Sequence, residues 1–244
     1  MHTYTSSPVD CLLMDTKEWK PCFAVIPLTG ARICIVDSIA CSGLSVIHSL
    51  LSSQVKQEDS TTVLLSFERP ASEFIRTGRR MGHDLNLLLI QKRFWSINLA
   101  CKEPSLGFKS LSLEESDLED GIMGILKDIV GVSGQKLNII ADGIMALSTV
   151  AGWPLSKIMR FIKQLESSMP KQIVIRINRD CTDAAILVQW LMHRCETSLI
   201  CNSLVSGITK QVHGELQIIK SPRDLTSCLM KCTDSSLLLQ YKVS

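Results

Sequence analysis

The sequence lacks an apolar run long enough to cross a membrane. Runs such as AAILVQWLM at 184–192 are short, whereas a spanning helix needs roughly 18 or more apolar residues. The first residues, MHTYTSSPVD, hold neither the basic cluster nor the apolar core of a secretory signal. We therefore expect a soluble, intracellular protein that does not contact a membrane.

The sequence also lacks the spacings of a zinc site or a disulfide framework, although it contains ten cysteines. No CxxC pair occurs, and the closest two, Cys228 and Cys232, have no second pair at metal-ligand spacing. The five histidines are scattered without an HxxxH pair. Several cysteines lie in or beside apolar segments, which predicts reduced, buried thiols and no metal (Cys34, Cys101, Cys195 and Cys201).

Strong charge of one sign is absent as well. The formal net charge is +2, which is too small to indicate nucleic-acid binding by itself. The 244 residues are 45% hydrophobic and 20% charged, a composition typical of an ordinary globular chain. This length is enough for one large α/β domain or two small ones.

What the sequence does contain is a regular alternation of strand and helix patterns. Nearly continuous apolar strands separated by helices are typical of a parallel sheet covered on both faces. The last two strands have no helix between them, which predicts an antiparallel C-terminal edge. The pattern predicts strands at 31–39, 61–67, 85–90, 136–147, 172–178, 198–207, about 210–220 and 236–243, with helices at 43–55, 71–85, about 119–131, 153–169 and 182–195.

We therefore predict one three-layer α/β domain that spans residues 1–244. Residues 1–30 form an N-terminal extension in this interpretation. The segment 101–118 is rich in Pro, Gly and Ser and is expected to be a loop. No internal repeat and no linker divides the domain.

The loop after the first predicted strand is where an open α/β sheet binds its ligand. A phosphate-binding P-loop would read G-x-x-x-x-G-K-[S/T] at this place. The segment from Ser38 to Ser45, SIACSGLS, keeps Gly43 and Ser45 but replaces the first glycine with Ser38 and the lysine with Leu44. Since leucine offers a polyphosphate neither charge nor donor, we expect that the chain is not an enzyme and holds no cofactor.

Two acidic residues fit the same degenerate nucleotide site. Asp142 ends the apolar run LNIIAD, as a Walker-B aspartate would, and Glu68 follows VLLSF, where ATPases of the RecA type carry a water-activating glutamate. The alternative is that both simply cap strands. The candidate nucleotide-binding residues are thus Gly43, Ser45, Glu68 and Asp142, on a scaffold without its lysine.

A basic stretch suggests a second kind of site. Arg76, Arg79 and Arg80 lie in the predicted helix 71–85, and Phe94 and Trp95 follow nearby in sequence. A basic surface beside aromatic rings can hold RNA through phosphate contacts and base stacking. The alternative is a solvated helix face whose arginines pair with acidic neighbours (Glu68, Glu73 and Asp84).

The segment SGITKQVHGELQII, at 206–219, contains Gly207, His213 and Gly214. Its glycines do not follow a strand-to-helix junction, as a phosphate loop would require. His213 has no companion ligand, so we expect no metal there. Alternating apolar residues favour an edge hairpin that turns or bulges at His213 and Gly214.

Three segments carry a resemblance to a known family. LVSGITKQVHGELQII, LLQYKVS and NIIADGIMALSTVAGWPLSKIMRFI resemble the family of Elongator complex protein 6, a RecA-like, Walker-motif-deficient subunit of the Elongator accessory ring. The resemblance covers most of residues 30–243. It implies a three-layer RecA-like sheet with a degenerate nucleotide site.

The resemblance also implies a function. The family member is a non-catalytic subunit of a hetero-hexameric ring formed with Elongator complex proteins 4 and 5. The ring binds tRNA and works with the catalytic Elongator subcomplex in wobble-uridine modification, in the cytoplasm and the nucleus. No tRNA-contacting residue carries over to this chain.

Alternatives remain open at this stage. The segment IVDSIACSGLSVIHSLL also looks like Elongator complex protein 5 of the same ring. A RecA/KaiC-type ATPase that uses Ser45, Glu68 and Asp142 is a second alternative, and a generic interaction module without an RNA role is a third.

Overall fold

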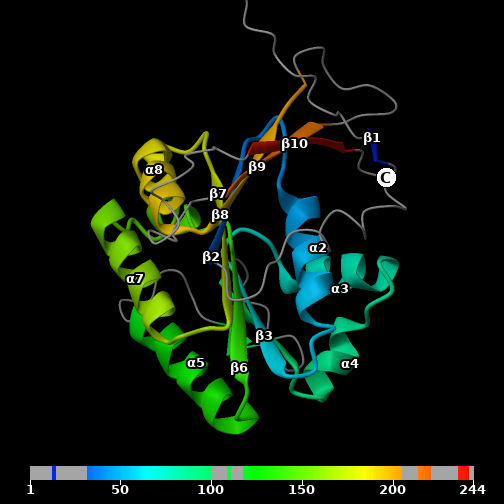
Figure 1. The fold of residues 1–244 in the computed structure, drawn as a ribbon. Helices are drawn as coiled ribbons and strands as arrows, with labels where there is room; N and C mark the ends of the chain where they lie inside the picture. The colour runs from blue at the N-terminus through cyan, green and yellow to red at the C-terminus, as the bar shows by residue number, and fades with distance from the viewer. Residues whose placement is uncertain are drawn as a thin grey trace, which may run out of the picture.

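The computed structural model describes residues 13–14, 32–99, 109–110, 118–204, 214–220 and 236–241. Within them the strands form a single sheet in the order β1-β10-β9-β8-β2-β7-β6-β3-β4-β5 (Figure 1). The strands are β1 (Leu13–Met14), β2 (Arg32–Asp37), β3 (Ser60–Ser66), β4 (Phe94–Asn98), β5 (Lys109–Ser110), β6 (Lys136–Asp142), β7 (Gln172–Asn178), β8 (Thr197–Asn202), β9 (Gly214–Lys220) and β10 (Ser236–Tyr241).

The body of this sheet is parallel. Every pairing from β8 through β2, β7, β6 and β3 to β4 and β5 runs in the same direction. β9 then adds antiparallel to β8, and β10 adds antiparallel to β9. The predicted fold class is therefore confirmed, including the antiparallel C-terminal edge.

Helices cover both faces of the sheet, which makes three layers (Figure 1). One face carries α2 (Leu44–Gln54), α3 (Ala71–Arg80) and α4 (Leu85–Ile90). The other carries α5 (Leu118–Ser133), α6 (Ala146–Thr149), α7 (Leu155–Ser167) and α8 (Ala184–Arg194).

Each face has its own core because successive strand residues point to opposite sides. In β2, Ile33 and Ile35 join the core under α2, whereas Cys34 and Val36 join the core under α7 and α8. This parity also decides on which face the polar residue at the end of a strand lies.

One predicted strand is wrong. LNLLLI at 85–90 forms α4, and one of the two strands that pair with β3 is β4, which was not predicted. Periodicity cannot separate a short apolar helix from a buried strand. The deciding contact is local, because the Asp84 carboxylate accepts hydrogen bonds from the backbone N–H groups of Asn86 and Leu87 and so caps the helix.

The predicted strand 136–147 is too long. β6 ends at Asp142, Gly143 takes a positive φ of 73°, and α6 begins at Ala146. Glycine adopts this backbone conformation without the steric cost that a Cβ would bring. The chain therefore turns at the residue after Asp142.

Free thiols are buried as expected at Cys34, Cys195 and Cys201, and the Cys41 thiol is buried as well. Cys101, Cys228, Cys232, Gly207 and His213 lie outside the described residues, so the predictions made for them stay predictions. Gly214 is the first residue of β9. None of the described helices has the length and apolarity that a bilayer crossing requires.

Candidate functional site

Four parallel strands bring polar side chains together at their carboxyl ends. Asp37, Asp142 and Arg176 follow the parity of apolar neighbours that face α2, which are Ile35 in β2, Ile140 in β6 and Val174 in β7. Glu68 comes just after β3. The carboxyl ends of parallel strands are where ligands bind in open α/β sheets.

Arg176 is the centre of this group. β7 lies between β2 and β6 in the sheet, so the Arg176 side chain reaches acidic groups on both sides. Its Nη1 is 2.8 Å from Asp37 Oδ2, its Nε is 2.5 Å from Asp142 Oδ1, and its Nη2 is 2.5 Å from Glu68 Oε2. We name these four residues the Arg176 cluster.

Three residues of the Arg176 cluster are almost completely removed from water, whereas Glu68 lies at the surface. Arg176 is 2% exposed, Asp37 1% and Asp142 0%. Burial raises the pKa of both aspartates, and the charge of Arg176 opposes that shift. Burial would lower the pKa of Arg176, but its attraction to Asp142, Asp37 and Glu68 outweighs this effect and leaves the pKa above its ordinary value. The guanidinium therefore stays charged.

Negative charge is in excess in the cluster, since one guanidinium faces three carboxyl groups. Each aspartate uses one oxygen for Arg176, and the other oxygens, Asp37 Oδ1 and Asp142 Oδ2, are buried without a hydrogen-bond partner in the described part of the chain. A further anion, such as a phosphate group, would be repelled by this arrangement.

Asp37 also occupies the N-terminus of α2. Its Oδ2 accepts a hydrogen bond of 2.8 Å from the backbone N–H of Gly43, the residue that precedes the helix. In a P-loop, backbone N–H groups at such a helix N-terminus bind phosphate. Here the chain's own carboxylate already binds there, and Ser38 and Cys41 close the loop with two backbone hydrogen bonds.

The structure thus brings three of the four predicted nucleotide-site residues to one place. Glu68 and Asp142 meet at Arg176, and Gly43 joins them through Asp37. Ser45 lies in the first turn of α2, and its buried hydroxyl oxygen has no hydrogen-bond partner among the described residues.

Sequence reasoning missed Arg176 and Asp37. A signal for Arg176 was present, because a charged residue inside the apolar strand QIVIRIN must find a partner when it is buried. The signal for Asp37 was the carboxylate that directly follows the apolar run ICIV. Neither signal identifies the residue with which the charged side chain pairs.

Gly143 makes room for Glu68. A Cβ built on this glycine would lie 2.3 Å from Glu68 Cγ and Cδ, which is far inside van der Waals contact. The absence of a side chain at this turn therefore lets Glu68 reach Arg176.

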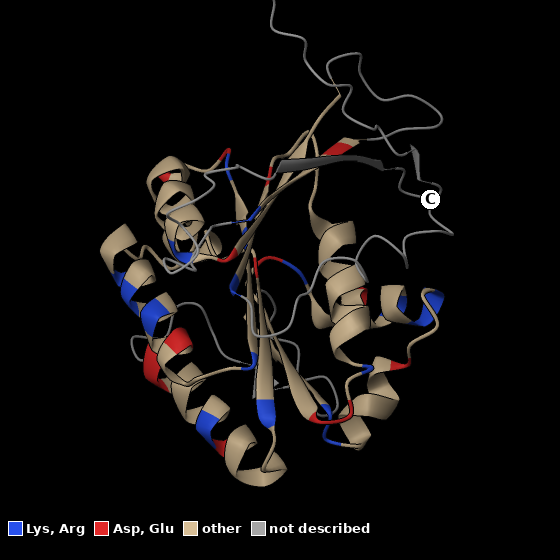
Figure 2. Ribbon diagram, in the orientation of Figure 1, with Lys and Arg blue, Asp and Glu red and all other residues tan. Residues whose placement is uncertain are grey.

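The three arginines predicted to bind RNA lie elsewhere, on the outer side of α3. Arg76, Arg79 and Arg80 are exposed, and basic residues colour the end of α3 in Figure 2. Arg79 Nε is 3.8 Å from Asp84, whereas Glu68 pairs with Arg176 and not with α3.

The aromatic half of the predicted RNA surface is not formed. Phe94 is 1% exposed and belongs to the core beneath α3 and α4. Trp95 is half-buried, and its Nε1–H donates to the backbone oxygen of Lys92. Successive residues of β4 point to opposite faces of the sheet, so the two rings do not lie together beside α3.

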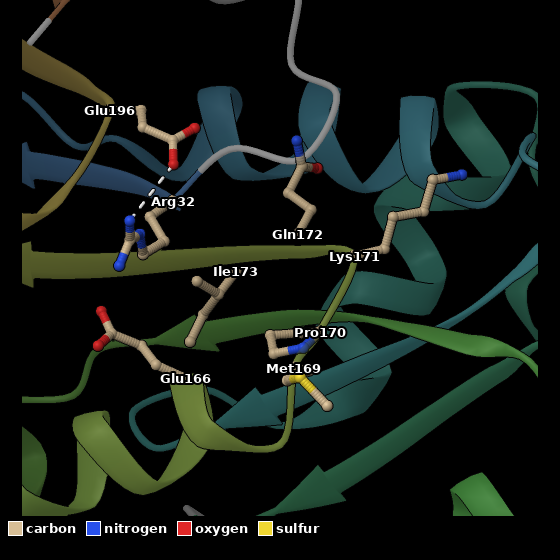
Figure 3. Close-up of a pocket in the computed structure, with 8 residues that line it drawn as sticks. All are labelled: Arg32, Glu166, Met169, Pro170, Lys171, Gln172, Ile173 and Glu196. Carbon is tan, nitrogen blue, oxygen red and sulfur yellow. Dashed lines mark ion pairs between the residues drawn. The ribbon is translucent and has the colours of Figure 1, made fainter. Parts of the chain in front are cut away.

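A pocket of about 280 Å³ lies at the opposite end of the sheet (Figure 3). Its charged groups already have partners. Arg32 is 3.5 Å from Glu196, the Lys171 ammonium is 2.8 Å from Asp59, and Glu166 pairs with Arg194. The pocket therefore offers a ligand little uncompensated charge. No group of three or more His, Cys, Asp or Glu residues in the described ranges is arranged to hold a metal ion.

No protein-family profile and no curated protein matches the sequence. Solved structures do match its fold. An uncharacterised protein from Pyrococcus horikoshii, crystallised with an unknown peptide, superposes with a TM-score of 0.59 at 14% identity and covers 79% of this chain and 84% of its own. A KaiC-like protein from the same archaeon gives a TM-score of 0.56 at 10% identity, over 88% of this chain and 91% of its own.

Identities this low establish the fold alone. The chain has a RecA/KaiC-like fold.

Proposed function

We propose that this chain is a non-catalytic, RecA-like subunit of the Elongator accessory ring. In that role it assembles with Elongator complex proteins 4 and 5 and supports tRNA binding and wobble-uridine modification by the catalytic Elongator subcomplex. The Arg176 cluster is the observation that supports the non-catalytic part. The resemblance of the C-terminal and central segments supports the Elongator part.

The physical reason is that side chains of this chain occupy the place at which a nucleotide would bind. A triphosphate would have to displace Asp37 from the Gly43 N–H and would face excess negative charge. Leu44 offers no donor in return, and its side chain packs against the core under α2. The fold is thus kept while the phosphate-binding contacts are replaced by internal ones.

Calorimetry with ATP and magnesium tests the non-catalytic part. We expect no heat of binding at millimolar nucleotide and no ATP hydrolysis by the purified chain. The matched variant is Ser45→Ala, which changes the hydroxyl that would hold magnesium in an active P-loop. Micromolar binding that Ser45→Ala abolishes would instead support the RecA/KaiC-type ATPase.

Co-expression followed by affinity purification tests the assembly part. We expect the tagged chain to capture Elongator complex proteins 4 and 5 together, in stoichiometric amounts. Capture of proteins 4 and 6 instead would make it the subunit-five member of the same ring. A stable monomer that captures none of them would refute the assignment.

A further inference from the structure

We propose that the outer sides of α3 and α4 form a docking surface for an acidic amphipathic helix of a partner protein. We name the residues that carry it the α3–α4 surface: Arg76, Arg80, Met81, Leu87, Ile90 and Lys92. This proposal is independent of membership in any ring, because it rests only on the chemistry of this surface.

The inner and outer sides of α3 are clearly separated. Ala71, Phe74 and Gly78 are buried against the sheet. Arg76 and Arg80 are one turn apart on the opposite side and are exposed. The outer side of α3 is therefore basic.

The outer side of α4 is apolar instead. Leu85 is buried, whereas Leu87 is 52% and Ile90 75% exposed. These two residues are three positions apart, so they lie on the same side of the helix. Met81, in the connection from α3, is also exposed.

The two outer sides make one surface. α3 and α4 cover the same face of the sheet (Figure 1), and they approach so closely that a Cβ on Gly78 would lie 3.0 Å from Leu85 Cγ. Both helices bury their inner sides against the same core. The exposed basic residues of α3 and the exposed apolar residues of α4 thus belong to the solvent sides of two neighbouring helices.

Within the described part of the chain, no acidic side chain neutralises the positive charge of this surface. Among the described residues, none forms an ion pair with Arg76, Arg80 or Lys92, and the nearby Glu73 is held by Arg69 at 3.0 Å. Arg79 has only the 3.8 Å contact with Asp84. A partner that carries carboxylates would supply the missing negative charge.

The apolar residues favour a protein partner over a nucleic acid. RNA held by stacking needs exposed aromatic rings, and Phe94 is buried while Trp95 bonds to Lys92. Leu, Ile and Met side chains instead receive the apolar stripe of a helix, in which anchors recur at i, i+3 or i+4 and i+7. Glutamates beside that stripe would then meet Arg76, Arg80 and Lys92.

Fluorescence anisotropy with a synthetic probe tests the proposal on the full chain. The probe is a labelled helical peptide with leucine at i, i+3, i+4 and i+7 and glutamate at most other positions. We expect micromolar binding that weakens at least about tenfold for Leu87→Ser with Ile90→Ser and for Arg76→Gln with Arg80→Gln. Val130→Ser with Val132→Ser, an exposed apolar pair on α5, is the matched control and should bind as the wild type does.

All these substitutions are at exposed positions, and circular dichroism of each variant should show the wild-type spectrum. Absence of peptide binding, or binding that the Leu87 and Ile90 pair does not affect, would overturn the proposal. Transfer RNA and phosphatidylserine vesicles serve as competing ligands. Binding of tRNA that depends on the arginines alone, without peptide binding, would assign the surface to RNA, and vesicle binding without peptide binding would assign it to a lipid surface.

Discussion

Arg176 is the residue on which the electrostatics of the site depend. A buried ion pair gains little over a well-packed apolar group, since removing two charges from water costs as much as their attraction returns. Removing only one partner is different, because an uncompensated charge then remains buried. The Arg176 cluster therefore indicates that the site disfavours a further anion, and it is weak evidence for the stability of the fold.

Replacing Arg176 with methionine should destabilise the fold by about 3–5 kcal/mol at pH 7, because Asp37 and Asp142 would stay buried without a cation. Urea unfolding measures this. Adding Asp37→Asn and Asp142→Asn should recover most of the loss, since no buried charge is left. If the free energy of unfolding of Arg176→Met alone were within about 1 kcal/mol of the wild-type value, the guanidinium would not compensate these carboxylates.

The buried imidazole of His48 predicts that the stability of the fold depends on pH. Burial lowers its pKa from 6.5 to about 4, and its ring packs against Phe74 at 5.1 Å. The unfolded chain therefore binds a proton more readily between these values, so the contribution of His48 is complete above pH 6.5 and is lost as the pH falls toward 4. The loss at pH 5 is about 2 kcal/mol.

The comparison of wild type with His48→Leu isolates this effect. The aspartates of the Arg176 cluster titrate in the opposite sense, because their pKa values are raised and protonation stabilises their buried form. Both proteins share that contribution. Urea unfolding at pH 7 and pH 5 should show a smaller loss for the variant, and equal losses would contradict the assignment.

At the scale of the element, local contacts decided what periodicity left open. The helix at 155–167 was predicted correctly because Ile158, Phe161, Ile162 and Leu165 recur at helical spacing and are buried. The strand predicted for LNLLLI was wrong because a segment of six mostly apolar residues fits a strand or a helix equally well, and the cap at Asp84 selected the helix.

The turn after β6 carries the prediction at this scale. Gly143→Ala should destabilise by more than the roughly 1–2 kcal/mol that a Cβ costs at positive φ, because the new methyl group also collides with Glu68. In a Glu68→Ala background the same change should cost only the backbone part. Thermal denaturation of the four proteins gives the double-mutant cycle. Equal costs in both backgrounds would show that Glu68 does not contact this turn.

At the scale of the whole molecule, one sheet joins two cores. Leu50 of α2 lies in one and Leu165 of α7 in the other, and both are fully buried. Since the same strands line both cores, damage to either should lower the stability of the entire sheet. The helical layers should not unfold separately.

Leu50→Ala and Leu165→Ala should each cost about 2–5 kcal/mol, through lost burial and the cavity left behind. Their effects should add within roughly 0.5 kcal/mol, because the two sites share no partner. Urea titration followed by both fluorescence and circular dichroism should show one transition for every variant. Two transitions would mean that the layers are independent.

The sequence by itself determined the alternation of layers and the antiparallel C-terminal edge, and it shows Leu44 at the position where a P-loop would carry its lysine. These follow from local periodicity and from the identity of single residues. It also placed Glu68 and Asp142 at strand ends, which the structure confirms.

Only the tertiary structure decided what those strand ends do. Arg176 and Asp37 are 139 positions apart in sequence, yet β7 lies beside β2, and the parity of both strands turns the two side chains toward α2. The order of strands in a sheet is set by how the crossovers pack, which no local pattern records. For that reason the sequence shows that QIVIRIN contains a charge that must be buried, but it does not show which residues pair with Arg176.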